Sequence, residues 1–450
     1  MASRLESHQD LLAHVDARIA SQVPQGSRVC VGYSGGLDSS VLLDLLARGR
    51  DRHRIELCAV HVHHGLSPQA DAWVAHCEAR ALSLEVPLAT ERVVVDRASA
   101  LGIEGAARAA RYAAYARTGA PFVALAHHLD DQAETVLLQL LRGSGLKGLA
   151  AMAGELPLFE PSSSRGAPVA TLLRPLLDVP RETLREYARV RALEWIEDES
   201  NDSLDMQRNA LRHAVIPVLA ERFPAWRVTL ARSARHAAAA ERLLAQLAAA
   251  DAGASLSSAA LAALDADRQA NVLRFFLASQ GLAMPSEARL ADIARQLARA
   301  RVDARVRIAH DGRWIVRHRG VIAVVDAAQV EPAWRQEWRG EPEVSLGASR
   351  GRVQFSARPG EGIALTAVRR GRWHFAARAG GERIRLEANR PTRTLKNLLQ
   401  EHGVPAWQRP AMPLLFHDDE LVWVPLVGVA ADHRCPPREE GLAPFWSPGS

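Results

Sequence analysis

One short segment, SGGLDS at residues 34–39, constrains the fold of this chain more than any other feature. It follows a β-rich run at residues 28–34 and precedes a helical pattern at residues 39–49 that ends at a glycine. Glycines between a strand and a helix let backbone N–H groups converge on an anion, and the helix N-terminus adds the positive end of its dipole. The segment therefore predicts a phosphate-binding loop at the end of a buried strand.

The loop carries groups that suit both phosphate and a cation. Serine hydroxyls can donate hydrogen bonds to phosphate oxygens, and Asp38 can hold a Mg²⁺ ion that bridges them. The loop lacks the lysine and the spacing of a Walker A motif, and it is not G-x-G-x-x-G. The predicted nucleotide-binding residues of this loop are Ser34, Gly35, Gly36, Leu37, Asp38, Ser39 and Ser40.

Strand and helix patterns alternate through residues 28–143, which predicts an α/β domain with a parallel sheet covered on both faces. Further strands are expected at residues 55–62, 91–96 and 121–128, and helices at residues 67–81, 104–118 and 130–143. Such sheets bind ligands at the carboxyl ends of their strands, where the strand order reverses. The loops that follow Ser34 and His128 are thus the expected walls of a site.

The second wall, HHLDDQAET at residues 127–135, is rich in acids. Asp131 and Glu134 lie three residues apart and share a face of the expected helix, where they can bind a cation, either Mg²⁺ or an ammonium group. Acids in a first helical turn also complement the helix dipole, and for Asp130 this explanation is equally good.

Histidines flank both walls of the expected site. Adjacent strand residues point to opposite faces, so one of His127 and His128 should contact the nucleotide while the other packs, and His127 is assigned to the nucleotide. His61 and His63 share a face, and His61 is assigned to the nucleotide as well. With no cysteine or third ligand nearby in sequence, a zinc site is not expected.

The chain has 450 residues, which is the length of about three domains. We expect a Rossmann-like ATPase domain at residues 1–225, a mainly helical middle domain at residues 226–330 and a small α+β domain at residues 350–450. The middle domain should contain a long helix at residues 228–250 and a small β-unit at residues 306–325. Residues 332–351 read as a linker, and residues 394–401 as a helix.

Composition excludes several classes of protein. The first residues carry charges where a signal peptide needs an apolar run, no stretch is long and apolar enough for a membrane span, and four cysteines do not make a disulfide framework. A cytoplasmic location without membrane contact is therefore expected. The net charge of +5 is compatible with a polyanionic partner. Lysine occurs only at Lys147 and Lys396; codon usage explains this arginine bias better than phosphate recognition does.

The strand, the SGGLDS loop and the helix together resemble the PP-loop superfamily of ATP pyrophosphatases. Together with HHLDDQAET, the chain closely resembles one family within it, bacterial tRNA(Ile)-lysidine synthetase. The likeness continues in order through the chain, in the segments HVHHGLSPQADAWVAHC at 61–77, RAARYAAY at 108–115, GSGLKGLAAM at 143–152, RPLL at 174–177, EDESN at 197–201, RNALR at 208–212 and RTLKNLLQEHGVPAWQRPAMPLL at 393–415.

The resemblance implies a two-step ligation that consumes ATP. The C2 oxygen of the cytidine at the first anticodon position of an isoleucine tRNA with a CAU anticodon is adenylated, and free L-lysine then displaces AMP to form lysidine. The resemblance assigns catalysis to Asp38, Asp131, Glu134, Arg111 and Arg208, with Mg²⁺ at Asp38 and Asp131. Asp131 is open to metal, to lysine or to both. The two C-terminal units would grip the tRNA, and a homodimer is compatible with the family. The candidate contacts to the tRNA backbone are Arg369, Arg370, Arg372, Arg390, Arg393 and Lys396.

Three other functions fit the sequence less well. A PP-loop tRNA thiolase carries sulfur on cysteines or on an iron–sulfur cluster, often with C-x-x-C spacing, which Cys30, Cys58, Cys77 and Cys435 do not have. An amidotransferase needs a glutaminase, for which no Cys-His nucleophile arrangement is present. The intact acids Asp38, Asp131 and Glu134 argue against an RNA-binding protein that has lost catalysis.

Overall fold

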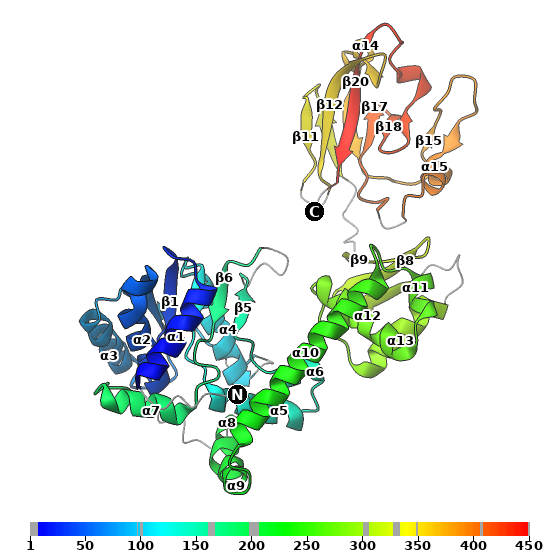
Figure 1. Cartoon of the computed structure of the whole chain (residues 1–450). Helices are drawn as coiled ribbons and strands as arrows, with labels where there is room; N and C mark the ends of the chain where they lie inside the picture. Colours follow the sequence, from blue (N-terminus) through cyan, green and yellow to red (C-terminus); the bar gives the residue numbers. More distant parts are fainter. Residues whose placement is uncertain are drawn as a thin grey trace. The chain divides into compact units, whose positions relative to one another are not determined.

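The computed structural model describes residues 8–96, 98–99, 102–160, 167–197, 207–299, 306–326, 334–347, 350–405 and 408–448. The chain divides into two compact units, Met1–Ala248 and Ala249–Ser450 (Figure 1). Each unit has its own sheets and its own hydrophobic core.

A six-stranded sheet forms the centre of the first unit, with the strand order β3-β2-β1-β4-β6-β5. Neighbouring strands pair in parallel except at the edge, where β5 runs antiparallel to β6. The predicted parallel sheet is thus confirmed, and its strand order reverses between β1 and β4. The strands are β1 Arg28–Gly32, β2 Glu56–His63, β3 Leu88–Arg92, β4 Phe122–Ala124, β5 Glu155–Leu158 and β6 Ala170–Leu173.

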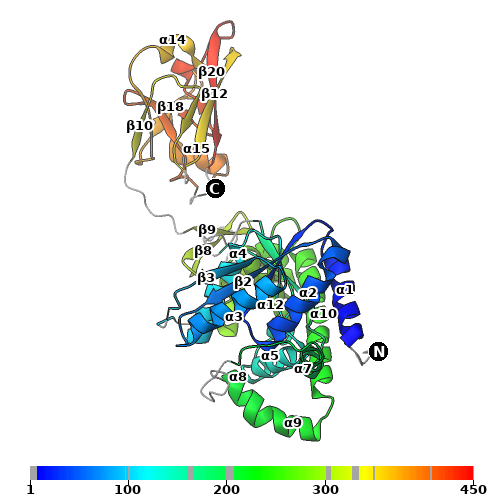
Figure 2. The same ribbon diagram turned by 90° about the vertical axis from the view of Figure 1, so that its left-hand side faces the viewer.

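Helices cover both faces of this sheet, as the alternation along β1 requires. Val29 and Val31 join a core with residues of α1, α2 and α7, whereas Cys30 joins a second cluster with Tyr115 of α4. Helices α1 and α2 contact each other and lie on the same side of the strands (Figure 2). The helices are α1 His8–Gln22, α2 Leu37–His53, α3 Ala70–Ser83, α4 Gly102–Ala116, α5 Leu129–Leu141, α6 Leu146–Leu149, α7 Arg181–Val190, α8 Gln207–Ala210, the π-helix η2 Leu211–Val215, α9 Ile216–Arg222 and α10 Trp226–Ala252.

A buried carboxylate fixes α7 against α2. Asp44 of α2 is 1% exposed and accepts hydrogen bonds from the Tyr187 hydroxyl at 2.8 Å, Arg80 at 3.0 Å and Arg191 at 3.4 Å. A buried carboxylate is tolerated when donors satisfy its oxygens, and removing one partner is costly. This network therefore holds α7 in place, and the first residue of α7 is Arg181, which reaches the site described below.

The strand predicted at residues 91–96 is wrong in position, because β3 spans Leu88–Arg92. Its pairing with β2 begins at Leu88, opposite Ala59, and ends at Arg92. Val94, which made the sequence read as a strand, is 95% exposed. The next residue, Val95, is buried, but in a cluster with Ala106 and Ala107 of α4 and not within the sheet.

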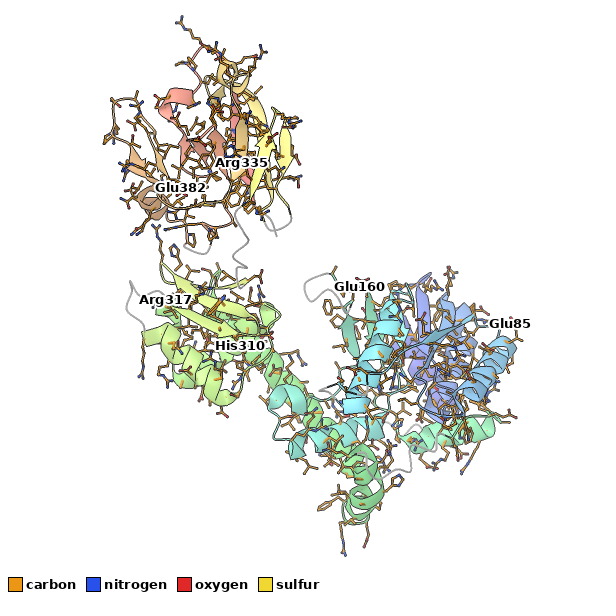
Figure 3. The ribbon with its side chains drawn as sticks, turned by 180° about the vertical axis from the view of Figure 1, so that it is seen from behind. Glu85, Glu160, His310, Arg317, Arg335 and Glu382 are labelled. Atoms are coloured by element: carbon orange, nitrogen blue, oxygen red, sulfur yellow. The ribbon has the colours of Figure 1, made fainter. Side chains whose placement is uncertain are left out.

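The second unit begins with a helical part that carries a three-stranded antiparallel sheet. Arg317 on β8 is buried and donates to the backbone oxygen of Leu297 at 3.5 Å, and Figure 3 shows its position. The elements are α11 Ser258–Ala263, α12 Ala266–Ser279, α13 Glu287–Arg299, β7 Arg307–His310, β8 Arg313–His318 and β9 Val321–Asp326. Helices followed by a small β-unit are thus present in this part of the chain, as the sequence predicts.

The C-terminal part of the second unit contains a five-stranded sheet of order β10-β14-β17-β18-β19 and a four-stranded sheet of order β11-β12-β20-β13. Two further short strands, β15 and β16, pair with each other. The elements are β10 Arg335–Trp338, β11 Glu343–Ser345, β12 Arg352–Pro359, β13 Ile363–Ala364, α14 Leu365–Val368, β14 Trp373–Ala376, β15 Arg383–Ile384, β16 Arg393–Thr394, α15 Leu395–Glu401, β17 Leu414–His417, β18 Glu420–Val424, β19 Gly428–Val429, η3 Ala431–His433 and β20 Glu440–Ser447.

The linker predicted at residues 332–351 is wrong, because β10 and β11 lie within it. Trp338 at the end of β10 is 2% exposed and stacks on Phe355 with ring centroids 4.0 Å apart. Each strand is only three or four residues long and mostly polar, so sequence periodicity did not reveal it. In the part of the chain described here, no helix is both long and apolar enough to cross a membrane.

Candidate active site

The SGGLDS loop connects the carboxyl end of β1 to the first turn of α2. Gly36 is the N-cap of α2, has an extended backbone and contributes no capping side chain. The Ser34 and Ser39 hydroxyl oxygens lie 3.0 Å apart, and the Ser39 hydroxyl donates to the Gly36 carbonyl at 3.0 Å. The first N–H groups of α2 are thus left for a ligand, beside hydroxyls that the loop itself orients.

Gly35 is the one loop position that tolerates no side chain. Its φ is +83°, and a Cβ atom there would lie 2.6 Å from Ile196 Cδ1 and 2.9 Å from Cys77 Sγ. The Ile196 N–H donates to the Gly35 carbonyl at 2.9 Å, so the segment that follows α7 packs directly on the loop. The loop at Gly35 is therefore packed against both Ile196 and Cys77.

His61, which the sequence analysis assigns to the nucleotide, is buried against Tyr33 and Cys77. It is 4% exposed, and its Nδ1 lies 3.0 Å from the Tyr33 carbonyl oxygen and 3.4 Å from Cys77 Sγ. Burial lowers the pKa of His61 and favours the neutral ring. The carbonyl therefore accepts from the Nδ1–H group, and the side chain supports the backbone that leads into Ser34.

Asp38 and Asp131, the two expected cation ligands, meet at His128. The His128 Nε2 atom lies 3.5 Å from Asp38 Oδ2 and 3.3 Å from Asp131 Oδ2, and Asp131 also accepts from the His128 backbone N–H at 3.1 Å. Burial lowers the pKa of His128, but the charges of Asp131 and Asp38 outweigh burial and raise it. The second histidine of the pair is therefore part of the site, where the sequence had expected it only to pack.

Glu134 is enclosed by two arginines. It is 2% exposed, and its carboxylate accepts from Arg208 Nε at 2.8 Å and from both Nε and Nη2 of Arg212 at 2.8 Å. Arg208 also donates to Asp131 Oδ1 at 3.3 Å. Burial opposes ionisation of Asp131, but the charges of His128 and Arg208 outweigh it and lower the pKa of Asp131. Asp131 is thus kept ionised, and its contacts with Arg208 and Arg212, at 3.3 and 3.8 Å, are longer than those of Glu134, at 2.8 Å.

His127 is held by a buried arginine. Arg174 is 4% exposed and donates from Nε to His127 Nδ1 at 3.2 Å and from Nη1 to the Ala153 carbonyl at 2.6 Å. An arginine donates and never accepts, so Nδ1 carries the lone pair and the proton of the neutral ring is on Nε2. Burial lowers the pKa of His127, and the charge of Arg174 adds to the effect. His127 is therefore a neutral donor.

Arg111 lies apart from the acids. It is an exposed residue of α4, and its charge acts with burial to lower the pKa of His64 to about 4. His64 follows the carboxyl end of β2, and its Nδ1 atom is buried without a hydrogen-bond partner. The structure thus brings Asp38, Asp131, Glu134 and Arg208 together and places Arg111 beside His64.

Sequence reasoning missed several site residues. Arg212 lies four residues after Arg208, and this spacing on one helix face was a usable signal. Arg181 had no such signal, because only the packing of α7 brings it to within 3.5 Å of Asp38.

Asp130 accepts a hydrogen bond from the Arg181 backbone N–H at 2.9 Å and contacts Arg227, so it caps α7. Most of the EDESN segment, residues 198–201, lies outside the described residues.

The residues present fit a magnesium ion. Asp38 Oδ1 is buried and has no hydrogen-bond partner, which is the kind of orphaned atom that a cation satisfies. Among the described residues there is no group of three or more His, Cys, Asp or Glu side chains placed to hold a metal. Mg²⁺ bound through one or two carboxylates together with substrate phosphates needs no such group.

Comparison with known proteins matches the chain in three segments. Residues 8–219 match the PP-loop domain, residues 256–322 the TilS substrate binding domain and residues 374–446 the TilS substrate C-terminal domain. A protein of Burkholderia pseudomallei (strain K96243) named tRNA(Ile)-lysidine synthase is 44% identical, over 91% of this chain and 90% of its own length. Proteins of the same name from Azoarcus sp. (strain BH72) and Nitrosomonas europaea (strain ATCC 19718) are 42% and 38% identical, each over 96% of this chain and 94% of their own length.

The glycine loop yields a matched pair of substitutions. Gly35→Ala should lower the free energy of unfolding by about 2–4 kcal/mol, because it adds a left-handed alanine to an overpacked contact. Gly36→Ala has room, since its Cβ would lie 3.6 Å from the nearest atom, Ser34 Oγ. Urea titrations of both variants provide the measurement. Equal stability of the two variants would contradict the packing described for Gly35.

The Arg174 contact predicts the titration of His127. A folded pKa below the ordinary value of about 6.5 keeps the ring neutral while the unfolded chain takes up a proton. Acidification below about pH 6.5 should therefore favour unfolding, by up to about 1.4 kcal/mol per pH unit from this group. Nitrogen-15 NMR of labelled histidines, assigned with His127→Gln, should show a neutral Nε2–H ring from pH 8 to pH 5. Protonation near pH 6.5 would contradict this account.

Proposed function

The chain belongs to the tRNA(Ile)-lysidine synthase family, and on this premise we propose that it joins free lysine to C2 of the cytidine at the first anticodon position of isoleucine tRNA reading CAU. ATP is converted to AMP and pyrophosphate. One observation carries the proposal. The uncapped start of α2 follows β1, and the acids of α5 follow the neighbouring strand β4, at the point where the strand order reverses. This pairing brings an anionic leaving group and a cationic amino acid to one place.

The first proposed step is attack of the cytidine C2 oxygen on the α-phosphate, with pyrophosphate leaving. The N–H groups at the start of α2 and the hydroxyls of Ser34 and Ser39 stabilise the charge that develops on the departing group. Asp38 and Asp131 would hold Mg²⁺, which, when bound, supplies further neutralisation of the phosphate oxygens. The neutral His127 Nε2–H is a further donor for the nucleotide.

The second proposed step is attack of the lysine amine on C2 after its ammonium group has lost a proton; the C–N bond forms as the C2–O bond breaks, and AMP leaves. Asp131 is the carboxylate that is available to a cation, because its arginine contacts are 3.3 and 3.8 Å long while those of Glu134 are 2.8 Å. Glu134 acts by fixing Arg208 and Arg212 beside Asp131. Arg208 then lies where it can steady the phosphate of the adenylated tRNA, and Arg111 is proposed to act on the nucleotide from α4.

The tRNA would be held by the middle domain at residues 226–330 and the C-terminal domain at residues 350–450. Arg390 pairs with Glu387, and Arg393 pairs with Glu401, which reduces their availability to phosphate. The exposed arginines that follow α14 carry no such pairing among the described contacts and are proposed as the main backbone-positioning residues. They are Arg369, Arg370 and Arg372. A cytoplasmic location is proposed from the composition of the chain, and a homodimer is compatible with the family resemblance.

The test is lysine transfer to a defined RNA. The purified protein with ATP, Mg²⁺ and radiolabelled lysine should label an unmodified isoleucine tRNA transcript that carries CAU, and should not label methionine tRNA with the same anticodon. Absence of label with ATP still consumed on another tRNA would overturn the proposed function and leave the PP-loop chemistry in place.

Asp131→Asn separates the two substrates in the same assay. It removes the charge that attracts the lysine ammonium group but keeps the shape of the side chain, so the KM for lysine should rise roughly tenfold or more while the KM for ATP changes less. Asp51→Asn, an exposed acid at the opposite end of α2, is the matched control and should leave both values unchanged. An unchanged lysine KM and kcat in Asp131→Asn would rule out the lysine contact.

A further inference from the structure

Every carboxylate of the site faces an arginine, but the contact of Asp38 differs from the others. Glu134 makes full hydrogen bonds to Arg208 and Arg212, and Asp130 is bonded to Arg227. Asp38 Oδ1 lies 3.5 Å from Arg181 Nε, and this pair makes no hydrogen bond. The positive charge of Arg181 offsets the negative charge of Asp38, but the Asp38 Oδ1 atom accepts no hydrogen bond.

Both atoms of this contact lack a hydrogen-bond partner. Asp38 Oδ1 and Arg181 Nε are each buried, and neither has a hydrogen-bond partner. An unsatisfied buried donor or acceptor costs more than a normal hydrogen bond contributes, and such atoms often mark the place of an unplaced ion or ligand. An acceptor such as a phosphate oxygen would satisfy Arg181, and a cation would satisfy Asp38.

Arg181 is anchored through its backbone, while its Nε atom faces Asp38 without a hydrogen bond. Its N–H is held by Asp130 at 2.9 Å, and the helix that it begins is fixed to α2 through Asp44. The Arg181 side chain as a whole is 37% exposed, although its Nε atom is buried, which leaves the side chain room to turn. Asp130 follows the carboxyl end of β4, so Arg181 is tied to the wall that faces the phosphate loop.

We propose that Arg181 is a phosphate-contacting residue that neutralises Asp38 until the nucleotide binds. Before binding, its guanidinium balances the Asp38 carboxylate from 3.5 Å. On binding, it gives up Asp38 to the cation that accompanies ATP and donates to a phosphate oxygen, which a planar guanidinium suits. This inference rests on the proposed function only in taking ATP as the ligand of the loop.

The exchange predicts opposite changes in two affinities. Arg181→Gln leaves Asp38 with His128 as its remaining cationic neighbour among the described contacts, so the nucleotide-free protein should bind Mn²⁺ about threefold more tightly or better, as measured by electron paramagnetic resonance. The same variant loses a phosphate contact, so calorimetry with ATP and a chelator should show roughly tenfold weaker binding. General damage to the site would weaken both affinities and cannot produce this pair of results.

Three further variants make the test specific. Arg185→Gln removes a charge one turn along α7, where Arg185 pairs with Glu182, and it should change neither affinity. Arg181→Lys keeps the charge and should keep the wild-type Mn²⁺ affinity. Adding Asp38→Asn to Arg181→Gln should abolish the gain in Mn²⁺ binding.

Each outcome decides part of the proposal. An unchanged or weaker Mn²⁺ affinity in Arg181→Gln would overturn the neutralising role, and an unchanged ATP affinity would overturn the phosphate contact. Both titrations omit tRNA and lysine. Failure of lysine transfer by the wild-type protein would therefore refute the proposed function and leave this inference standing.

Discussion

The reversal of strand order between β1 and β4 is the constraint on which the site depends. Chains that leave two adjacent parallel strands toward opposite faces open a crevice at their carboxyl ends. Here β1 leads into the uncapped start of α2, and β4 leads into α5, whose first turn carries Asp131. Within the described residues, no other pair of neighbouring strands in this sheet leads into both an anion-binding helix start and a row of acids. The sheet therefore places a helix start that favours an anion next to acids that favour a cation.

The site offsets the charge of its acids with arginines from later parts of the chain and with His128. Arg181 comes from α7, Arg208 and Arg212 come from α8 and the π-helix η2, and His128 bridges Asp38 and Asp131. Irregular helical turns such as η2 often mark functional sites. The tight pairs at Glu134 shape the wall, while the looser contacts at Asp38 and Asp131 are the ones that a ligand can replace.

Much of this arrangement follows from local sequence. Periodicity and glycine placement predicted the loop at Asp38, the acids of α5 and the parallel sheet, because these features depend on residues close together in the chain. The same reasoning missed Arg181, because 143 residues separate it from Asp38 and only the packing of α7 through Asp44 and Tyr187 joins them. It assigned His61 to the nucleotide, whereas the fold places that ring behind Tyr33. Tertiary contacts, and not the surrounding motif, decide which group a buried histidine contacts.

In the proposed first step, the loop directs the cytidine oxygen to the α-phosphate of ATP. This attack fixes the fate of one atom, because the attacking C2 oxygen must leave with AMP when lysine takes its place. An isoleucine tRNA that carries oxygen-18 at C2 of the anticodon cytidine tests it directly. Mass spectrometry of the products should find the label in AMP, and label absent from AMP, with lysidine formed, would contradict the account.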